Sequence, residues 1–234
     1  MGKNLKDKTA QPILFDPAKE SVDEFAKRWP VERVIDNYSE LLEELFLIRN
    51  PKYRFNKDHK ADFKKFANAH VGTCNLEEVG RWFYFPWNRL LVHYLENALH
   101  QELRTARNKN IITAAEQKKF YDFTVGIGGL SVGSHVALTL VMMGGAKKIK
   151  LADPDTISGS NLNRIRSDFT QVGMSKCDSV VHQVYQMNPY AEIHAYPEGI
   201  MLENLGEFMD GLDVLVDELD NPELKIRLRL EARK

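Results

Sequence analysis

A glycine-rich turn between a short apolar run and a helical pattern constrains this chain of 234 residues more than any other segment. Residues 126–134 read G-I-G-G-L-S-V-G-S; we predict a strand over 120–127 before them and a helix over 132–143 after them. Glycines in such a turn let strand and helix approach closely and let backbone amides reach a phosphate group. The turn therefore predicts a nucleotide-binding α/β domain; a turn needed only for packing is the alternative.

Beyond this turn, apolar runs continue to alternate with helical patterns. We predict strands over 147–152, 191–196 and 213–216, and helices over 175–187, 203–209 and from 222 to the end. Strands that alternate with helices form βαβ units around a parallel sheet. The predicted fold class is α/β, a Rossmann-like parallel sheet with helices on both faces, over residues 119–234. Because the chain ends in a helix just after the fourth strand, we expect this domain to be truncated.

Residues 1–118 differ in pattern and are predicted to form a mainly helical N-terminal region. Apolar residues at helical spacing indicate helices over about 32–48, 61–69 and 88–106. Trp82, Tyr84 and Trp87 belong to an aromatic segment between the last two of these helices. We interpret them as core or interface packing rather than as a surface that stacks on a ligand.

Charge and composition argue against several classes of protein. The formal net charge is −1, which gives no electrostatic reason to expect nucleic acid as a partner. No apolar run approaches the roughly 18 residues of a spanning helix, so we expect no membrane contact. Cys74 and Cys177 are the only cysteines and form no CxxC pair. We therefore expect no zinc site and favour a reduced, cytoplasmic protein.

Acidic side chains follow two of the predicted strands. Asp153, at the end of the second strand, is placed to accept hydrogen bonds from a ribose, and Asp155 better suits the cap of a turn. Asp220 follows the fourth strand, at the sheet edge where ligands bind in such folds. It is a candidate ligand for Mg²⁺, which prefers one or two carboxylates together with phosphate oxygens.

Two cations follow the second predicted strand. Arg164 ends the segment S-N-L-N-R over 160–164 and offers a fork of donors for phosphate oxygens. Lys176 stands at a helix start, where the helix dipole disfavours a cation. An anionic ligand explains that position, and a solvated surface lysine is the alternative. A triphosphate fits these cations better than a dinucleotide does.

Taken in order, these residues resemble the ThiF/MoeB/HesA superfamily of adenylating domains, which are related to ubiquitin-activating enzymes. The resemblance covers roughly residues 104–234. It rests on Gly126-x-Gly128-Gly129-Leu130, Asp153, Asn161-Leu162-Asn163-Arg164, Lys176 and Asp220-Asn221. It implies that the glycine turn and the Asp153–Asp155 segment bind the nucleotide, with Asp153 on the ribose. Asn161, Arg164 and Lys176 would contact the phosphates, and Asp220 would hold Mg²⁺.

The resemblance also implies a reaction. Members join ATP to a carboxylate, often the C-terminus of a ubiquitin-like protein, and release pyrophosphate and an acyl adenylate. We therefore expect ATP and Mg²⁺ as cofactors and a ubiquitin-like protein, peptide or small molecule as the carboxylate substrate. Arg164, Lys176 and Asp220 would act in catalysis. Arg107 matches an arginine that reaches the ATP of the other subunit, so we expect a homodimer; a solvated helix end is its alternative.

The sequence departs from the family pattern in three ways. Ser131 stands where G-x-G-x-x-G has glycine, and the turn is one residue longer than in many relatives. The region before the domain resembles a bacterial subgroup of ThiF-like proteins. Cys177 is expected to be a small buried residue, not a thioester nucleophile. A nicotinamide- or flavin-linked oxidoreductase and a non-catalytic nucleotide-binding module are the alternative functions.

Overall fold

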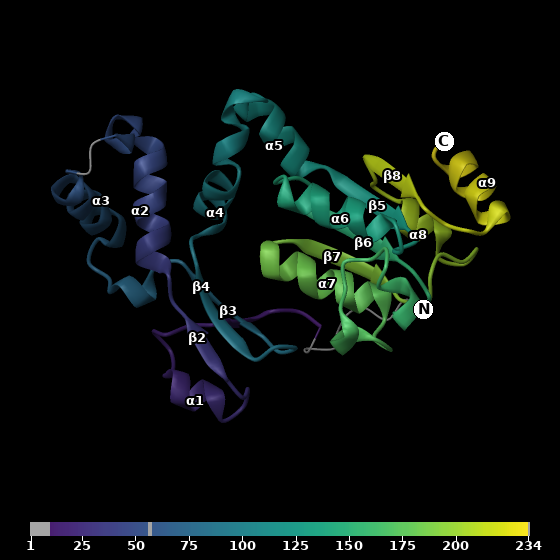
Figure 1. Cartoon of the computed structure of the whole chain (residues 1–234), viewed down its shortest axis with the longest axis horizontal. Helices are drawn as coiled ribbons and strands as arrows, with labels where there is room; N and C mark the ends of the chain where they lie inside the picture. Colours follow the sequence, from purple (N-terminus) through teal and green to yellow (C-terminus); the bar gives the residue numbers. More distant parts are fainter. Residues whose placement is uncertain (1–9, 56–57, 234) are drawn as a thin grey trace. The chain divides into compact units, whose positions relative to one another are not determined.

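The computed structural model describes residues 10–55 and 58–233 and divides into two compact units. One unit is Pro12–Ile111, and the other begins at Ile112 (Figure 1). The domain limit expected at 118 falls inside a helix, α5, that belongs with the second unit. No helix among the described residues is both long and apolar enough to cross a membrane.

The unit that begins at Ile112 is built on a four-stranded parallel sheet in the order β7-β6-β5-β8 (Figure 1). Its strands are β5 (Thr124–Gly128), β6 (Lys148–Ala152), β7 (Glu192–Tyr196) and β8 (Val214–Asp217). Its helices are α5 (Ala114–Asp122), α6 (Gly133–Met142), α7 (Lys176–Met187), α8 (Leu205–Met209) and α9 (Pro222–Glu231), with short 3₁₀ turns at Gly159–Asn161 and Phe169–Gln171. The predicted α/β class is confirmed.

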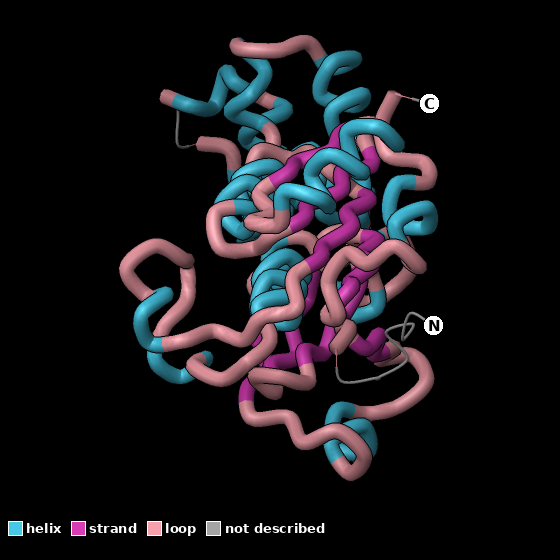
Figure 2. The backbone as a smooth tube through the Cα atoms, turned by 90° about the vertical axis from the view of Figure 1, so that its right-hand side faces the viewer, coloured by secondary structure: helices cyan, strands magenta, loops and turns pink. Residues whose placement is uncertain are grey.

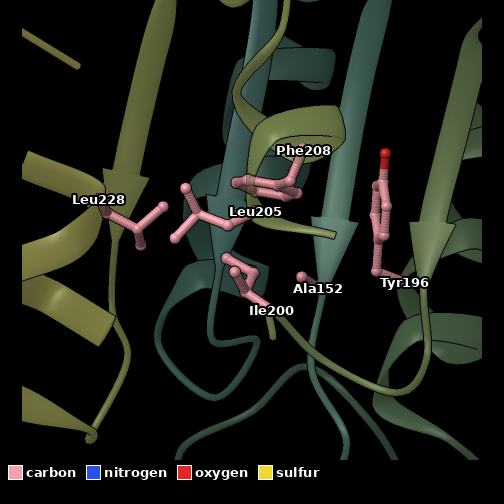
Figure 3. Close-up of a cluster of buried hydrophobic side chains, with 6 residues drawn as sticks. All are labelled: Ala152, Tyr196, Ile200, Leu205, Phe208 and Leu228. Atoms are coloured by element: carbon pink, nitrogen blue, oxygen red, sulfur yellow. The ribbon is translucent and has the colours of Figure 1, made fainter. Parts of the chain in front are cut away.

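Helices cover both faces of this sheet. On one face α6 packs against α7, and a methyl group on Gly133 of α6 would lie 2.7 Å from Cγ2 of Ile127 in β5. On the other face α8 and α9 pack together over a cluster of buried side chains that includes Phe208 and Leu228 (Figure 3). Alternate residues of β5 thus point into two separate apolar layers, which places the end of this strand at the centre of the unit.

Lys150 of β6 also reaches the layer of α8. Its ammonium group donates to the carbonyl oxygens of Glu207 and Asp210, each at 2.7 Å. Glu207 lies within α8, which has only five residues, and Asp210 is the residue that caps its C-terminus. A lysine at a helix C-terminus satisfies carbonyls that have no partner within the helix. The contact fixes this short helix to the sheet.

Most of the strands and helices predicted after the glycine turn are confirmed to within two residues, but the first strand is not. The predicted strand over 120–127 begins too early, because 114–122 form α5 and β5 starts at Thr124. The side chain of Thr113 caps α5 and pairs with Glu116 in a capping box. The Phe120 ring then lies where a methyl group on Gly145 would have to go, 2.3 Å away. The apolar run therefore belongs half to a helix and half to a strand.

The unit Pro12–Ile111 contains a second sheet, in the order β1-β3-β4-β2, that we did not predict. Its strands, drawn in magenta in Figure 2, are β1 (Ile13–Phe15), β2 (Arg33–Ile35), β3 (Arg81–Phe85) and β4 (Leu90–Tyr94). Its helices are α1 (Val22–Ala26), α2 (Tyr38–Arg49), α3 (Lys60–Val71) and α4 (Asn97–Arg104), with 3₁₀ turns at Pro51–Arg54, Leu76–Glu78 and Ala106–Asn110.

Two helices predicted in this unit are partly wrong. The helix expected over 88–106 is a strand in its first half, since β4 pairs with β3 through a tight turn in which Arg89 has a φ of 56°. The helix expected over 32–48 begins only at Tyr38, whose amide donates to the Asp36 side chain, and 33–35 form β2. The helix expected over 61–69 is confirmed as α3. Runs of neighbouring apolar residues fit both the helical period of about 3.6 residues and the strand period of about 2, so the sequence pattern did not separate helix from strand here.

A buried histidine organises the core of this unit. His93 is 1% exposed and its ring stacks between Trp82 and Tyr38, with centroids 4.2 Å away on each side. Its Nδ1 lies 3.0 Å from a carboxylate oxygen of Asp36, and its Nε2 lies 2.6 Å from the carbonyl oxygen of Val79. Each ring nitrogen thus has a polar partner, one a carboxylate and the other a backbone carbonyl.

Replacing His93 with Phe keeps an aromatic ring in the stack and removes both hydrogen bonds. We expect the H93F variant to lose about 2–4 kcal/mol of unfolding free energy, since each lost bond strands a polar partner. Urea unfolding followed by tryptophan fluorescence measures this, because all three tryptophans lie in this unit. The matched control is His194→Phe, at an exposed position of β7. Equal stability of H93F and the unmodified chain would contradict the expectation.

Candidate functional site

The glycine turn has a backbone that other residues cannot adopt without strain. Gly129 has a φ of +87°, and a methyl group on it would lie 2.3 Å from the carbonyl oxygen of Glu218. The amide of Gly129 donates to the Ala152 carbonyl at 2.8 Å, and the amide of Glu218 donates to the Gly128 carbonyl at 2.8 Å. The turn is therefore held between the ends of β6 and β8, where the carboxyl ends of the parallel strands meet.

The other glycines of this segment serve packing. Methyl groups on Gly126 and Gly128 would lie 2.5 Å from Leu212 and 2.9 Å from Ile200, on the face that α8 covers. Gly133 allows α6 to approach Ile127, the contact for which G-x-G-x-x-G uses its third glycine. Ser131 is tolerated because that glycine has moved to 133. The packing alternative therefore holds for Gly126, Gly128 and Gly133.

Asp153 is tied into this turn. It is 4% exposed, and its Oδ2 accepts the amide of Leu130 at 2.6 Å, while its Oδ1 accepts the amide of Asp155 at 2.9 Å. Leu130 itself is buried. The Asp153 carboxylate therefore caps the turn after β6 and anchors the glycine turn at the same time. Its predicted contact with a ribose stays a prediction.

Lys176 is buried beside Asp153. It is 5% exposed, and its ammonium nitrogen lies 2.7 Å from Oδ2 of Asp155 and 3.5 Å from Oδ1 of Asp153. The alternative of a solvated surface lysine is therefore wrong. Ser175 caps α7 through the amide of Asp178, which sets the lysine in the first turn of that helix. The ammonium group thus faces two carboxylates, the buried Asp153 and the exposed Asp155.

Arg164 is exposed and lies on the turn that crosses from β6 to α7. Its Nη1 donates to the Ser160 carbonyl and to the side-chain oxygen of Asn163, each at 3.0 Å. Asn161 is 9% exposed, and its side-chain oxygen accepts the amide of Ser158 at 3.0 Å. Asn161 therefore shapes this turn, and Arg164 is exposed on it.

His135 is a residue that sequence reasoning missed. Its Nε2 lies 2.6 Å from the carbonyl oxygen of Arg164, so the imidazole donates to that carbonyl and ties the turn to the first turn of α6. The glycine turn leads directly into the same helix. His135 thus fixes the backbone of a predicted phosphate ligand relative to the predicted phosphate cradle. Nothing in the local sequence pattern signals this contact, which spans separate elements.

Acidic groups at the end of β8 differ in their surroundings. Asp220 is exposed, and its carboxylate forms no hydrogen bond or ion pair with another residue that the structure describes. Asp217 lies opposite Gly128 in the sheet register, with Lys225 at 3.6 Å and Arg229 at 3.8 Å. Asn221 caps α9. Among the described residues, no group of three or more His, Cys, Asp or Glu side chains is placed to hold a metal ion. A cation at Asp220 would therefore need further oxygen ligands from a bound molecule such as a nucleotide.

Arg107 belongs to the other unit. It is exposed on the 3₁₀ turn Ala106–Asn110, at the end of the unit Pro12–Ile111. Its exposure is compatible with both hypotheses for Arg107: a solvated helix end, or a side chain that reaches a ligand. Its contact with the nucleotide of a second subunit stays a prediction.

Cys177 is fully buried and cannot act as an accessible nucleophile. Its sulfur lies 3.5–3.7 Å from the carbonyl oxygens of Leu151, Asp153 and Tyr196. Burial raises the pKa of this thiol to about 12. Because the thiolate is the reactive form, this raised pKa makes the sulfur a poor nucleophile at pH 8. The expectation of a small buried residue fits this environment.

Alkylation separates the two cysteines. With iodoacetamide at pH 8 under native conditions, we expect rapid labelling of Cys74, which is exposed, and none of Cys177 within an hour. Peptide mass spectrometry measures the two sites, and labelling after denaturation provides the control that both thiols are reduced. Rapid native labelling of Cys177 would contradict its burial.

A model of the ThiF family matches residues 105–233 of this chain. The chain belongs to the ThiF family. The matched range contains the glycine turn, both acids after β6, Arg164, Lys176 and Asp220. Membership in the predicted family is therefore confirmed.

Relatives place the chain within that family. It is 37% identical over 157 residues to an uncharacterized protein, MT1398, of Mycobacterium tuberculosis, a match that covers 67% of this chain and 22% of the relative. It is 26% identical over 192 residues to the adenylyltransferase and sulfurtransferase UBA4 of Lodderomyces elongisporus, covering 82% of this chain and 38% of UBA4. The chain thus spans between 22% and 38% of the length of these curated relatives.

A solved structure shares the fold of this ThiF-family chain. The tRNA N6-threonylcarbamoyladenosine dehydratase TcdA of E. coli aligns with a TM-score of 0.53 and 24% identity, over 56% of each chain. At this level of identity the likeness shows the common fold.

Replacing Gly129 with Ala tests the geometry of the glycine turn. The methyl group would clash with a backbone carbonyl, and the positive φ adds about 1–2 kcal/mol of strain. We expect the melting temperature to fall by about 5–10 °C. The control is Gly159→Ala, where a methyl group meets nothing within 4 Å and φ is not positive. Thermal unfolding by circular dichroism compares the two, and equal melting temperatures would contradict the geometry.

Proposed function

We propose that this chain binds ATP with Mg²⁺ at the carboxyl ends of β5, β6 and β8 and uses it to adenylate a carboxylate. The observation that carries the proposal is Lys176, a buried cation beside the glycine turn. An ammonium group has three donors; Asp155 accepts one of them, and Asp153 forms a longer ion pair. A donor is left for a phosphate oxygen. Burying an ammonium group costs desolvation free energy, and an apolar residue would fill the same space without that cost. Packing alone therefore does not explain a lysine at this position.

The surrounding groups suit a phosphate chain. The amides that follow Leu130 and the N-terminus of α6 offer donors to an anion, and Arg164 adds a guanidinium group from a turn whose backbone contacts His135. Asp220 has a free carboxylate at the same edge of the sheet and would hold Mg²⁺ together with phosphate oxygens. The metal would neutralise charge on the phosphates. Asp153 and Asp155, by contrast, position the glycine turn and Lys176.

The proposed reaction is a substitution at the α-phosphorus. A carboxylate oxygen of the substrate forms a bond to that phosphorus, the bond to the bridging oxygen of the β-phosphate breaks, and pyrophosphate leaves with its electron pair. The products are an acyl adenylate and pyrophosphate. Lys176 and Arg164 stabilise the negative charge that gathers on the phosphoryl oxygens during this step. Neither a covalent bond to the protein nor a redox step is needed.

Relatives support this choice of chemistry. UBA4 is named an adenylyltransferase and sulfurtransferase, and TcdA has been crystallised with ATP and with AMP. A substrate such as a ubiquitin-like protein, a peptide or a small carboxylic acid suits the family reaction, as does a homodimer in which Arg107 reaches the second site. A nicotinamide- or flavin-linked function would leave Lys176 and Arg164 without a role, because a dinucleotide has no γ-phosphate.

Nucleotide binding tests the proposal first. Calorimetric titration of the chain with ATP–Mg²⁺ and separately with NAD⁺ should give tighter binding of ATP. We expect Lys176→Met and Asp220→Asn to weaken ATP–Mg²⁺ binding about 10-fold or more, since each removes a charged contact. The control is Arg227→Ala, which removes an exposed arginine paired with Glu223 on α9. Tighter binding of NAD⁺ than of ATP would overturn the proposal.

Catalysis has its own measurement. With ATP, Mg²⁺ and labelled pyrophosphate, a panel of carboxylate substrates should include one that supports pyrophosphate–ATP exchange. Arg164→Ala should lower that exchange by about 10²-fold, as expected when a charge-stabilising contact of the transition state is lost. Exchange that proceeds at the same rate in the R164A variant would contradict the role of this arginine.

A further inference from the structure

A small cavity lies next to Lys176, between α6, α7 and the turn that carries Arg164. Its volume is about 10 Å³, room for one water-sized sphere. Polar side chains from three elements line it: Ser134 of α6, Arg166 and Ser167 of the turn, and Lys176 and Gln183 of α7. Leu130, at the end of the glycine turn, also borders it. Arg166, which the sequence did not single out, therefore borders the same cavity as Lys176.

The polar neighbours of Arg166 are already engaged with one another. Ser167 Oγ donates to Gln171 at 2.6 Å, Ser134 Oγ donates to the Ser131 carbonyl at 2.9 Å, and Gln183 donates to Ser179. Arg166 differs from them. It is exposed, and its guanidinium group forms no hydrogen bond or ion pair with any other residue in the described part of the chain. All five of its N–H donors are therefore available.

The backbone on both sides of Arg166 is nevertheless held in place. Ile165, before it, is 9% exposed and its amide donates to the Asn161 carbonyl at 3.1 Å. Ser167, after it, is fixed by Gln171 and donates its own amide to the Ile165 carbonyl at 2.9 Å. The backbone position from which the side chain reaches the rim of the cavity is thus held by its neighbours.

Charge indicates what Arg166 adds. Asp153, Asp155 and Asp220 bring three negative charges to the proposed site, and Lys176 and Arg164 bring two positive ones. Positive charge attracts a polyphosphate, and Arg166 adds a third cation. Arg164 also spends one nitrogen on its own turn, whereas Arg166 spends none. A planar fork of this kind suits bidentate contact with phosphate oxygens.

We propose that Arg166 is a second arginine of the phosphate site and binds the β- and γ-phosphates of the nucleotide, and hence the pyrophosphate product. The proposal rests on the proposed function, since it assigns a residue to the same site. It also explains why the turn carries two arginines that are separated by one buried residue. Arg164 and Arg166 contact the polyphosphate from the turn between β6 and α7, and Lys176 contacts it from α7.

Binding of three ligands tests this assignment: ATP–Mg²⁺, inorganic pyrophosphate with Mg²⁺, and AMP. In calorimetric titrations, Arg166→Ala should weaken ATP and pyrophosphate about 10-fold and leave AMP unchanged, because AMP lacks the two outer phosphates. Arg166→Lys should recover part of the loss, since it keeps a charge without the fork. Arg227→Ala again serves as the control for loss of an exposed arginine.

Each result decides the matter. The assignment is overturned if R166A binds ATP and pyrophosphate as the unmodified chain does, or if it loses AMP to the same extent as ATP. A melting temperature unchanged within about 2 °C would show that R166A is folded, as expected for an exposed side chain. If the unmodified chain binds no ATP, the proposed function fails as well; if it binds ATP and Lys176→Met abolishes that binding while R166A does not, only Arg166 is excluded.

Discussion

The buried contacts of the Asp153 carboxylate join the parts of the proposed site. One oxygen accepts the Leu130 amide and so holds the glycine turn against β6, and the other accepts the Asp155 amide and faces the Lys176 ammonium. Three elements that are far apart in sequence, β5, β6 and α7, thus meet at one side chain. Charge-assisted hydrogen bonds in a buried setting are stronger than neutral ones, so this group holds the site in shape.

The sequence predicted the parallel sheet well because its signals are local. A glycine turn and regular alternation of strands with helices define β6, β7, β8 and the helices between them. The sheet of the first unit was missed for a physical reason. In β4 the buried residues Leu91 and His93 stand among apolar neighbours, so strand and helix periods fit equally, and pairing with β3 decides the structure. Sequence pattern does not report such pairing.

The candidate site shows the same division. Asp153, Lys176 and Arg164 could be chosen from residue type and order, and the sheet brings the first two together. Their partnerships could not be predicted: that Lys176 is buried between two carboxylates, that His135 holds the Arg164 carbonyl, and that Arg166 borders the same cavity. Each depends on contacts between α6, α7 and the turn from β6, which are set by tertiary packing.

The strand β8 lies at an edge of the parallel sheet and pairs with β5. An edge strand offers its outer amides and carbonyls to any extended chain, which is how unrelated molecules come to aggregate. Here the strand has four residues, and aspartates stand at both ends, Asp213 just before it and Asp217 as its last residue. A chain that added to this edge would bring its own backbone past both carboxylates. Within this chain, short length and flanking charge thus make β8 a poor template for an added strand.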